Sequence, residues 1–348
     1  MTAPSRISGL PMRRREFIGF VISASLGVSA GVTLPRAARA QPSGEGVRRL
    51  GALTVTAPND PVSTGRATVL KQSLAALDWK EGSNLRIDWH DGGGDLALIE
   101  RAADQLIAAA PDVLLAVGTP CVAALRRRTS TIPIVFAVVT DPIDQGFVAS
   151  LSRPGGNVTG FTDYDGPMAG KWLEMLMQIA PSAAHVAVLY NPSTAPFAEI
   201  MMRTLQEAAP SLAVTVRAVQ LRDAAAIAPT IAALSAEKST ALLVLPDFFT
   251  MTNRAAILAS AAQANLPAVY WNRAFVDDGG LMSYGTDNSD IIRGAAAYID
   301  RILEGEKPVD LPVQNPTKFE LALNLKTAKA LGITISPTLL ATADEVIE

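Results

Sequence analysis

Cysteine and histidine are scarce in this 348-residue sequence, which has one cysteine, Cys121, and two histidines, His90 and His185. A single cysteine excludes an intramolecular disulfide. One thiol and two distant imidazoles do not fit the ligand spacing of a zinc site. The glycine-rich stretch 91–95, "DGGGD", lacks both the lysine of a P-loop and the spacing of a dinucleotide fingerprint. We therefore expect no metal and no other cofactor.

Long basic runs are also missing. Beyond the first 40 residues the longest is Arg126–Arg127–Arg128, and without residues 1–40 the formal net charge changes from −3 to −8. Nucleic-acid-binding proteins carry a basic patch or stripe. The sequence therefore argues against a nucleic-acid partner.

Long apolar runs without charges occur only near the N-terminus. There "RRREFIGF" precedes "VISASLGVSAGVTL", and "PRAARA" ends at Ala40. A basic head, a short apolar stretch and small residues before the break are typical of an export signal. Residues 14–18, "RREFI", resemble a twin-arginine signal, while the general secretion route and an uncleaved anchor remain alternatives. We expect residues 1–40 to be a signal peptide and the mature protein to lie in the periplasm.

From residue 47 on, short Val/Ile/Leu runs alternate with amphipathic stretches at helical spacing. This alternation of strand and helix patterns predicts parallel sheets with helices on both faces. It is broken by "SRPGGNVTGF" at 152–161 and by "GGLMSYGTD" at 279–287, which we interpret as chain crossings. The predicted fold is α/β, with two similar doubly wound parallel-sheet lobes joined by hinge crossings. The first lobe would hold 47–160 and about 286–310, the second 161–285 and about 311–348. A single (β/α)8 barrel is the alternative.

Short polar side chains and prolines follow most of the predicted strands. In open parallel sheets, ligands bind beyond the carboxyl ends of the strands, where helix N-termini and short side chains can hold polar groups. Each such residue could equally be a helix cap. The candidates are Asn59 and Asp60, Gly118 and Thr119, Thr140 and Asp141, Asn191, Asp247, and Asn272.

Cys121 stands where a helix is predicted to begin, after "LLAVGTP". A thiol in such a place can have a lowered pKa and act as a nucleophile. A Cys121–His90 pair, or a racemase or isomerase using Cys121, is thus an alternative. Two-lobed racemases normally need a second thiol, and the sequence has none. We expect Cys121 to be a packing residue.

Aromatic residues make up 5% of the chain, and several fall in or near the predicted edge loops of the second lobe. Such rings could sandwich a planar or apolar ligand, although core packing explains most aromatic residues. The group consists of Tyr164, Phe248, Phe249, Tyr270, Trp271, Phe275 and Tyr284.

Several motifs together resemble one family. They are "SRPGGNVTGFT", "GKWLEML", "VAVLYNP", "LLVLPD" and "PTKFELALNLKTAKALGI". From about residue 47 to the C-terminus the chain is similar to the substrate-binding proteins of ABC transporters with the type I periplasmic-binding fold. The similarity is greatest to the group that resembles tryptophan/tyrosine-binding components.

This resemblance implies a protein that is not an enzyme and that delivers a small molecule to a membrane permease. It also implies hinge closure around the ligand. For an α-amino acid, helix N-terminal amides would hold the carboxylate, and Asp141 or Asp247 the ammonium. We expect a monomer, and a sensor partnered with a membrane kinase remains an alternative. By motif position, the first lobe would contribute Asn59, Asp60, Gly118, Thr119, Thr140 and Asp141, and the second Thr162, Asp163, Asn191, Asp247 and Asn272, with Asp287 after the second crossing.

Overall fold

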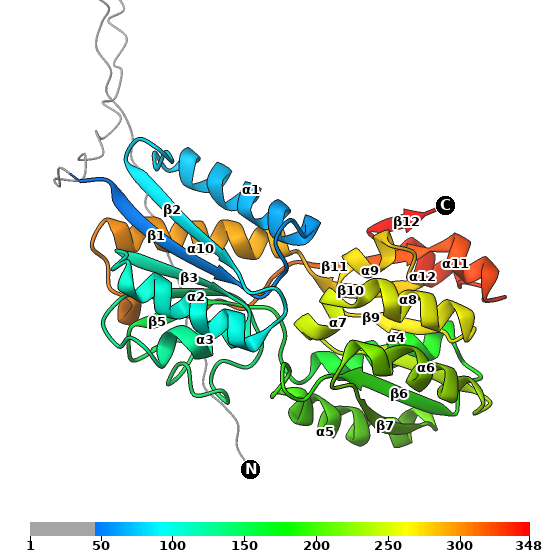
Figure 1. The fold of residues 1–348 in the computed structure, drawn as a ribbon. Coiled ribbons are helices and arrows are strands. Elements are labelled where there is room, and N and C mark those ends of the chain that lie inside the picture. The colour runs from blue at the N-terminus through cyan, green and yellow to red at the C-terminus, as the bar shows by residue number, and fades with distance from the viewer. Residues whose placement is uncertain (1–45) are drawn as a thin grey trace, which may run out of the picture. The chain divides into compact units, whose positions relative to one another are not determined.

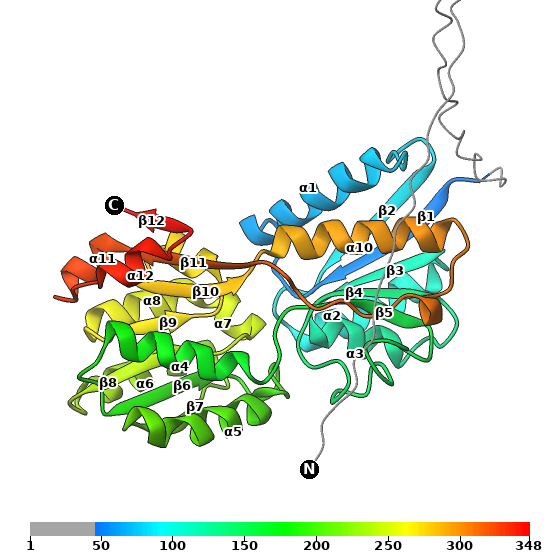
Figure 2. The same cartoon turned by 180° about the vertical axis from the view of Figure 1, so that it is seen from behind.

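Two separate sheets organise the protein. The computed structural model describes residues 46–348, and these residues belong to one compact unit (Figures 1 and 2). The expected signal peptide, residues 1–40, lies outside the described residues. The prediction of two α/β lobes is confirmed, and the single-barrel alternative is wrong, because the strands divide between two open sheets.

The sheet of the first lobe has five strands, all parallel. Its strands are nearly continuous apolar runs, such as "VLLAV" in β3, because both faces of a parallel sheet are covered. In sheet order the strands are β2 (Leu85–Asp91), β1 (Arg48–Thr54), β3 (Val113–Val117), β4 (Ile134–Val139) and β5 (Val158–Thr162).

Helices cover both faces of this first sheet. One face is packed by α1 (Pro61–Ala76) and by α10 (Asn288–Leu303), which comes from late in the chain and lies beside α1 in both ribbon views. The other face is packed by α2 (Leu96–Ala108) and α3 (Thr119–Arg126). The first lobe therefore depends on a helix that the chain adds only after building most of the second lobe.

The sheet of the second lobe has seven strands, and only the β10–β11 pair is antiparallel. In sheet order they are β12 (Glu345–Ile347), β11 (Phe319–Asn324), β10 (Met282–Thr286), β9 (Ala268–Tyr270), β8 (Thr240–Val244), β6 (His185–Tyr190) and β7 (Thr215–Gln220). Its helices are α4 (Met168–Ile179), α5 (Ala198–Ala208), α6 (Ile227–Ser235), α7 (Phe248–Thr252), α8 (Arg254–Gln263), α9 (Arg273–Asp277), α11 (Leu325–Ala330) and α12 (Pro337–Ala341). Three 3-10 turns complete the described chain: η1 (Ala209–Leu212), η2 (Ala224–Ala226) and η3 (Pro308–Asp310).

The chain passes between the lobes three times: after β5, after β10, and between η3 and β11. In the third crossing the Gln314 N–H donates to the Gly160 carbonyl, and the Thr162 N–H donates to the Gln314 carbonyl. Asp163, just after β5, donates from its N–H to the Val139 carbonyl and accepts from the Thr140 hydroxyl, so Thr162 and Asp163 lie with the first lobe and not with the second, where the resemblance placed them. The crossings lie side by side, which is the arrangement a hinge requires.

Helix caps explain several of the polar residues that follow strands. The side chains of Asp60, Asp247, Asn272 and Asp287 each accept a hydrogen bond from a backbone N–H in the first turn of α1, α7, α9 and α10, respectively. Such caps satisfy N–H groups that have no partner inside the helix. These four residues therefore have a structural role irrespective of any ligand.

Among residues 46–348, no helix is both long enough and apolar enough to cross a bilayer.

Candidate functional site

A small cavity lies between the lobes at the carboxyl ends of the strands. Its empty volume is about 510 Å³, a figure that includes space open to solvent, and both lobes contribute to its lining. The first lobe lines it with Val55, Thr56, Arg66, Val117, Gly118, Thr119, Pro120, Val138, Thr140 and Asp163. The second lobe lines it with Thr194, Phe197, Pro246, Asp247, Phe248, Met251 and Trp271.

Arg66 supplies a buried positive charge to this cavity. It lies on the inner face of α1, four residues before buried Leu70, and is 7% exposed. Its Nε is buried without a hydrogen-bond partner, and within residues 46–348 its guanidinium makes no hydrogen bond or ion pair. Burial lowers the pKa of Arg66, while the charges of Asp163 and Asp60 act in the opposite direction. A buried guanidinium without a partner is costly, and an anionic ligand would compensate it.

Asp163 follows β5 and places a carboxylate in the same cavity. Its Oδ1 accepts hydrogen bonds from the Thr140 hydroxyl at 2.8 Å and from the Tyr164 N–H at 2.7 Å. Neither of these two hydrogen bonds uses Oδ2. Burial raises the pKa of Asp163 to about 6, and the hydrogen bonds from Thr140, from the Tyr164 N–H and from its own N–H, together with the Arg66 charge, act to lower it.

Backbone irregularities at two strand ends shape the first-lobe wall. A bulge in β4 gives Val138 a φ of 58°, a strained value for a β-branched residue, and Val138 lines the cavity. After β3, Gly118 has a φ of 97°, and a Cβ there would lie 2.8 Å from a Val55 methyl carbon. The tight turn at Gly118 brings the first residues of α3, Thr119 and Pro120, to the cavity. The positive end of the α3 dipole therefore also favours an anion.

The second-lobe wall is mainly apolar and rigid. Trp271 donates from Nε1 to the Thr250 hydroxyl, and its ring meets those of Tyr164 and Phe275 edge to face. The Tyr164 hydroxyl in turn donates to the Trp271 carbonyl. These contacts fix one large aromatic face, which suits a flat apolar group in the ligand.

Asp247 lies in this apolar wall, but its oxygens already have partners. Oδ1 accepts from the Thr194 hydroxyl at 2.5 Å and the Phe249 N–H at 2.9 Å, and Oδ2 accepts from the Asn191 N–H at 2.7 Å. Burial raises the pKa of Asp247 to about 7, and the three hydrogen bonds oppose that rise. This carboxylate therefore joins β6, the following turn and α7.

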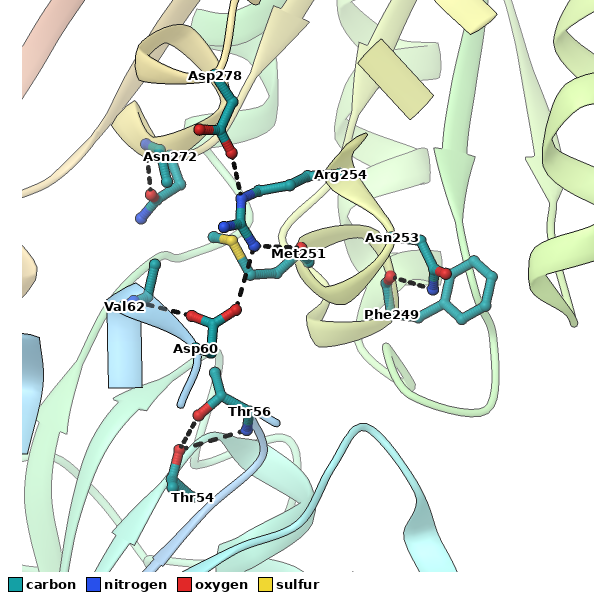
Figure 3. A network of polar contacts seen from close by, with 11 residues as sticks. Thr54, Thr56, Asp60, Val62, Phe249, Met251, Asn253, Arg254, Asn272 and Asp278 are labelled. Atoms are coloured by element: carbon teal, nitrogen blue, oxygen red, sulfur yellow. Dashed lines mark hydrogen bonds and ion pairs between the residues drawn. The ribbon is translucent and has the colours of Figure 1, made fainter. Parts of the chain in front are cut away.

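Five of the twelve residues expected from the sequence line the cavity: Gly118, Thr119, Thr140, Asp163 and Asp247. Asn191 donates its backbone N–H to Asp247, and Asn272 caps α9; neither residue lines the cavity. Thr162 and Asp287 line a different hollow, beside the crossings. Asn59 and Asp141 have positive φ values and do not line the cavity. Asp60 pairs with Arg254 across the lobes (Figure 3).

The cavity is also lined by residues that were not predicted from the sequence, above all Arg66. Arg66 could have been found from its spacing, because it lies four and eight residues before Leu70 and Leu74 and so shares their buried face of the helix. Two members of the aromatic group, Phe248 and Trp271, line the cavity. Tyr270, by contrast, stacks on Phe275 inside the second lobe.

Cys121 is completely buried and packs in the apolar cluster under α2 and α3. It does not line the cavity, and burial raises the pKa of its thiol well above the ordinary value. A buried thiol with a raised pKa is a poor nucleophile. Among residues 46–348, no group of three or more His, Cys, Asp or Glu residues is placed to hold a metal ion.

A wider hollow adjoins the cavity on the outer side of α3. It shares Thr119 and Pro120 with the cavity and is otherwise lined mostly by α3 and by the loop before β5. Its empty volume of about 1790 Å³ likewise includes open solvent, and the second lobe contributes only Ser193 and Pro196 to its lining.

Comparison with known proteins gives a consistent picture. Residues 61–347 match the family model described as ABC transporter substrate binding protein. A curated relative, the tyrosine-binding protein of Clostridioides difficile (strain R20291), is 28% identical over 262 residues, 75% of each chain. Two solved structures have TM-scores of 0.80, each covering 86% of this chain and 99% of its own. One is a conserved domain protein from Vibrio cholerae, 30% identical, and the other is the ABC domain in complex with L-Trp from Streptococcus pneumonia, 27% identical.

Proposed function

The chain belongs to the family of ABC transporter substrate-binding proteins, and from this premise we propose that its ligand is an α-amino acid with an aromatic or large apolar side chain. A protein of this family captures a small molecule between its lobes and delivers it to an ABC importer. The observation that carries the proposal is the buried guanidinium of Arg66, without a partner among residues 46–348, in the same cavity as Asp163.

The two charges match the two ends of a zwitterion. Arg66 would bind the ligand carboxylate, helped by the N-terminal turn of α3, and Oδ2 of Asp163, which the hydrogen bonds from Thr140 and Tyr164 do not use, would accept from the ammonium. Asp163 thereby takes the role that the resemblance had left to Asp141 or Asp247. Asp141 lies outside the cavity lining, and the oxygens of Asp247 are occupied.

The side chain of the ligand would face the second lobe. Phe197, Phe248, Met251 and Trp271 offer it apolar and aromatic surface, and each buried CH₂ group contributes about 0.8 kcal/mol. The relatives that bind tyrosine and L-Trp support this choice.

We also propose how the protein acts, its oligomeric state and its location. The protein acts by binding alone and catalyses no reaction, which the burial of Cys121 away from the cavity supports. It works as a monomer. It is exported, with residues 1–40 removed after about Ala40.

The test is calorimetry and thermal denaturation of the chain without residues 1–40, using tryptophan, tyrosine, leucine, glutamate and a pentose. A ligand that binds only the folded state raises the melting temperature by mass action. We expect tryptophan, tyrosine or leucine to raise it, and glutamate and the pentose to leave it unchanged. Binding of the pentose without any amino acid would contradict the proposal.

A further inference from the structure

An ion pair joins the two lobes beside the cavity without lining it. Arg254 Nη1, in the second lobe, lies 3.3 Å from Asp60 Oδ2, in the first. Their side chains are only 15% and 13% exposed. The pair is therefore partly shielded from water and screened less than a surface salt bridge.

Each partner is also held in place by its own lobe (Figure 3). Arg254 donates from Nε to Asp278 at 2.7 Å and from Nη1 to the Met251 carbonyl at 3.2 Å. Asp60 accepts from the Val62 N–H at 2.8 Å through its other oxygen. When the lobes meet, little side-chain freedom remains to be lost, so most of the attraction favours closure.

The ion pair lies between two elements that line the cavity. Asp60 caps α1, which carries Arg66, and Arg254 contacts the last turn of α7, which carries Phe248 and Met251.

Other contacts of these elements also cross between the lobes. Phe248 packs in the same apolar cluster as Leu53 and Val55 of the first lobe. A Cβ at Gly94, in the first lobe, would lie 3.3 Å from the Thr252 hydroxyl oxygen, so the backbone there approaches α7 closely. The lobes thus meet closely in this region, with the ion pair at its border.

We propose that Asp60 and Arg254 form a latch that sets ligand affinity by stabilising the closed lobes, without touching the ligand. The inference rests on the proposed function in taking the ligand to bind between the lobes. Apparent affinity scales with the population of the binding-competent state, so a latch acts equally on every ligand the cavity accepts. Because the latch forms only on closure, its loss speeds release and leaves the association rate nearly unchanged.

The test is a double-mutant cycle of Asp60→Asn and Arg254→Met, with rates measured by stopped-flow fluorescence. Asn at 60 keeps the cap on α1 but can turn an amide toward Arg254. We expect each single variant to raise Kd and the dissociation rate about tenfold, the size of a lost hydrogen bond to a charged group. The double variant should have a Kd no higher than that of either single variant, and Arg254→Lys should restore part of the affinity.

The matched control is Arg217→Met, which removes an exposed ion pair with Glu237 inside the second lobe.

A second measurement keeps this inference separate from the choice of ligand. Spin labels on cysteines at the exposed positions Gln72 and Gln206, one in each lobe, would report the distance between lobes before any ligand is added. The single native thiol is buried and would react slowly. Arg254→Met should shift the distance distribution toward longer values even if no amino acid binds. An unchanged distribution, or additive effects on Kd in the cycle, would overturn the latch.

Discussion

The two buried carboxylates of the cavity, Asp163 and Asp247, look alike in the sequence and differ in the structure. Each follows a strand, each is almost inaccessible to solvent, and burial raises the pKa of each, to about 6 and about 7. Asp247 uses both of its oxygens for hydrogen bonds within the second lobe. The described hydrogen bonds of Asp163 use one oxygen only.

The same contrast separates the two walls of the cavity. The first lobe contributes unused polar capacity, namely the Arg66 guanidinium and one Asp163 oxygen. The second lobe contributes aromatic and apolar surface around a saturated carboxylate. We infer that the first lobe recognises the charged groups of the ligand and the second lobe recognises its side chain. Buried polar groups left without partners discriminate strongly between ligands, because a ligand that fails to pair them leaves their desolvation cost in place.

Replacing Arg66 should have the largest effect. For Arg66→Met we expect Kd for the best amino acid to rise about 100-fold or more, roughly 3 kcal/mol, because the carboxylate loses its buried partner. The unliganded protein should melt at a higher temperature, since a buried guanidinium that makes no hydrogen bond among residues 46–348 is removed. Calorimetry and thermal denaturation measure both. Lys71→Met, on the exposed face of the same helix, is the matched control. A Kd within threefold of the original would contradict the assignment.

The Asp163→Asn variant should rank second. An asparagine can keep the hydrogen bonds from Thr140 and the Tyr164 N–H, but it presents an amide donor where the ammonium would lie. We expect Kd to rise about 30-fold, roughly 2 kcal/mol, with little change in melting temperature. Equal affinity in the variant and the original protein would show that the ligand ammonium has another partner.

Asp247→Asn should lower the stability of the protein and leave its affinity almost unchanged, the reverse of the result expected for Asp163→Asn. Either orientation of the new amide directs its NH₂ group at a donor, the Asn191 N–H or the Thr194 and Phe249 pair. We expect the free energy of unfolding to fall by about 1.5 kcal/mol, and the melting temperature to fall by a few degrees. Kd should change less than threefold. A large loss of affinity with unchanged stability would place the ammonium on this residue and erase the contrast with Asp163.

Lowering the pH should raise Kd less than either Arg66→Met or Asp163→Asn does. Asp163 must be ionised to pair with an ammonium, and its pKa is about 6. Between pH 7 and pH 5 we therefore expect Kd to rise about tenfold, a dependence that Asp163→Asn should remove. A profile that is the same in both proteins would count against this role.

The stability of the unliganded protein should follow the opposite trend. The pKa values of Asp163 and Asp247 in the folded protein lie above the ordinary value of 3.8. Protonation therefore favours the folded state. The stability from these two groups is complete below pH 3.8 and is lost as the pH rises through about 6 and 7. Urea denaturation at pH 5 and pH 8 measures the free energy of unfolding, to which these two groups should contribute more at pH 5 than at pH 8.

The fold could be predicted because its signals are local and repeated. Apolar runs such as β3 mark strands buried on both faces, and the glycine-rich breaks lie near the first two crossings. The addition of α10 to the first lobe was expected, but the passage of residues 311–314 along β5 was not, because pairing at such sequence separation leaves no local pattern.

The site could be predicted only in part. Strand-end position was enough to predict Thr119, Thr140 and Asp247 in the cavity lining, whereas Asp163 was expected only from the family resemblance. It could not show that both oxygens of Asp60 would be used elsewhere, which depends on Arg254, 194 residues away. Arg66 lies in the middle of a helix, where arginines are usually exposed, and only its alignment with Leu70 and Leu74 marks it as buried. The bulge that brings Val138 to the cavity has no sequence signature.

The most direct test of the two-wall account compares three molecules that share one side chain: the best-binding amino acid, its amine without the carboxylate, and its acid without the ammonium. Calorimetry would measure each against the original protein, Arg66→Met and Asp163→Asn. The account predicts that removing the carboxylate costs at least about 100-fold in the original protein and little in Arg66→Met. Removing the ammonium should matter less in Asp163→Asn than in the original protein. If the original protein binds the amine as tightly as the amino acid, Arg66 does not recognise a carboxylate and the account is wrong.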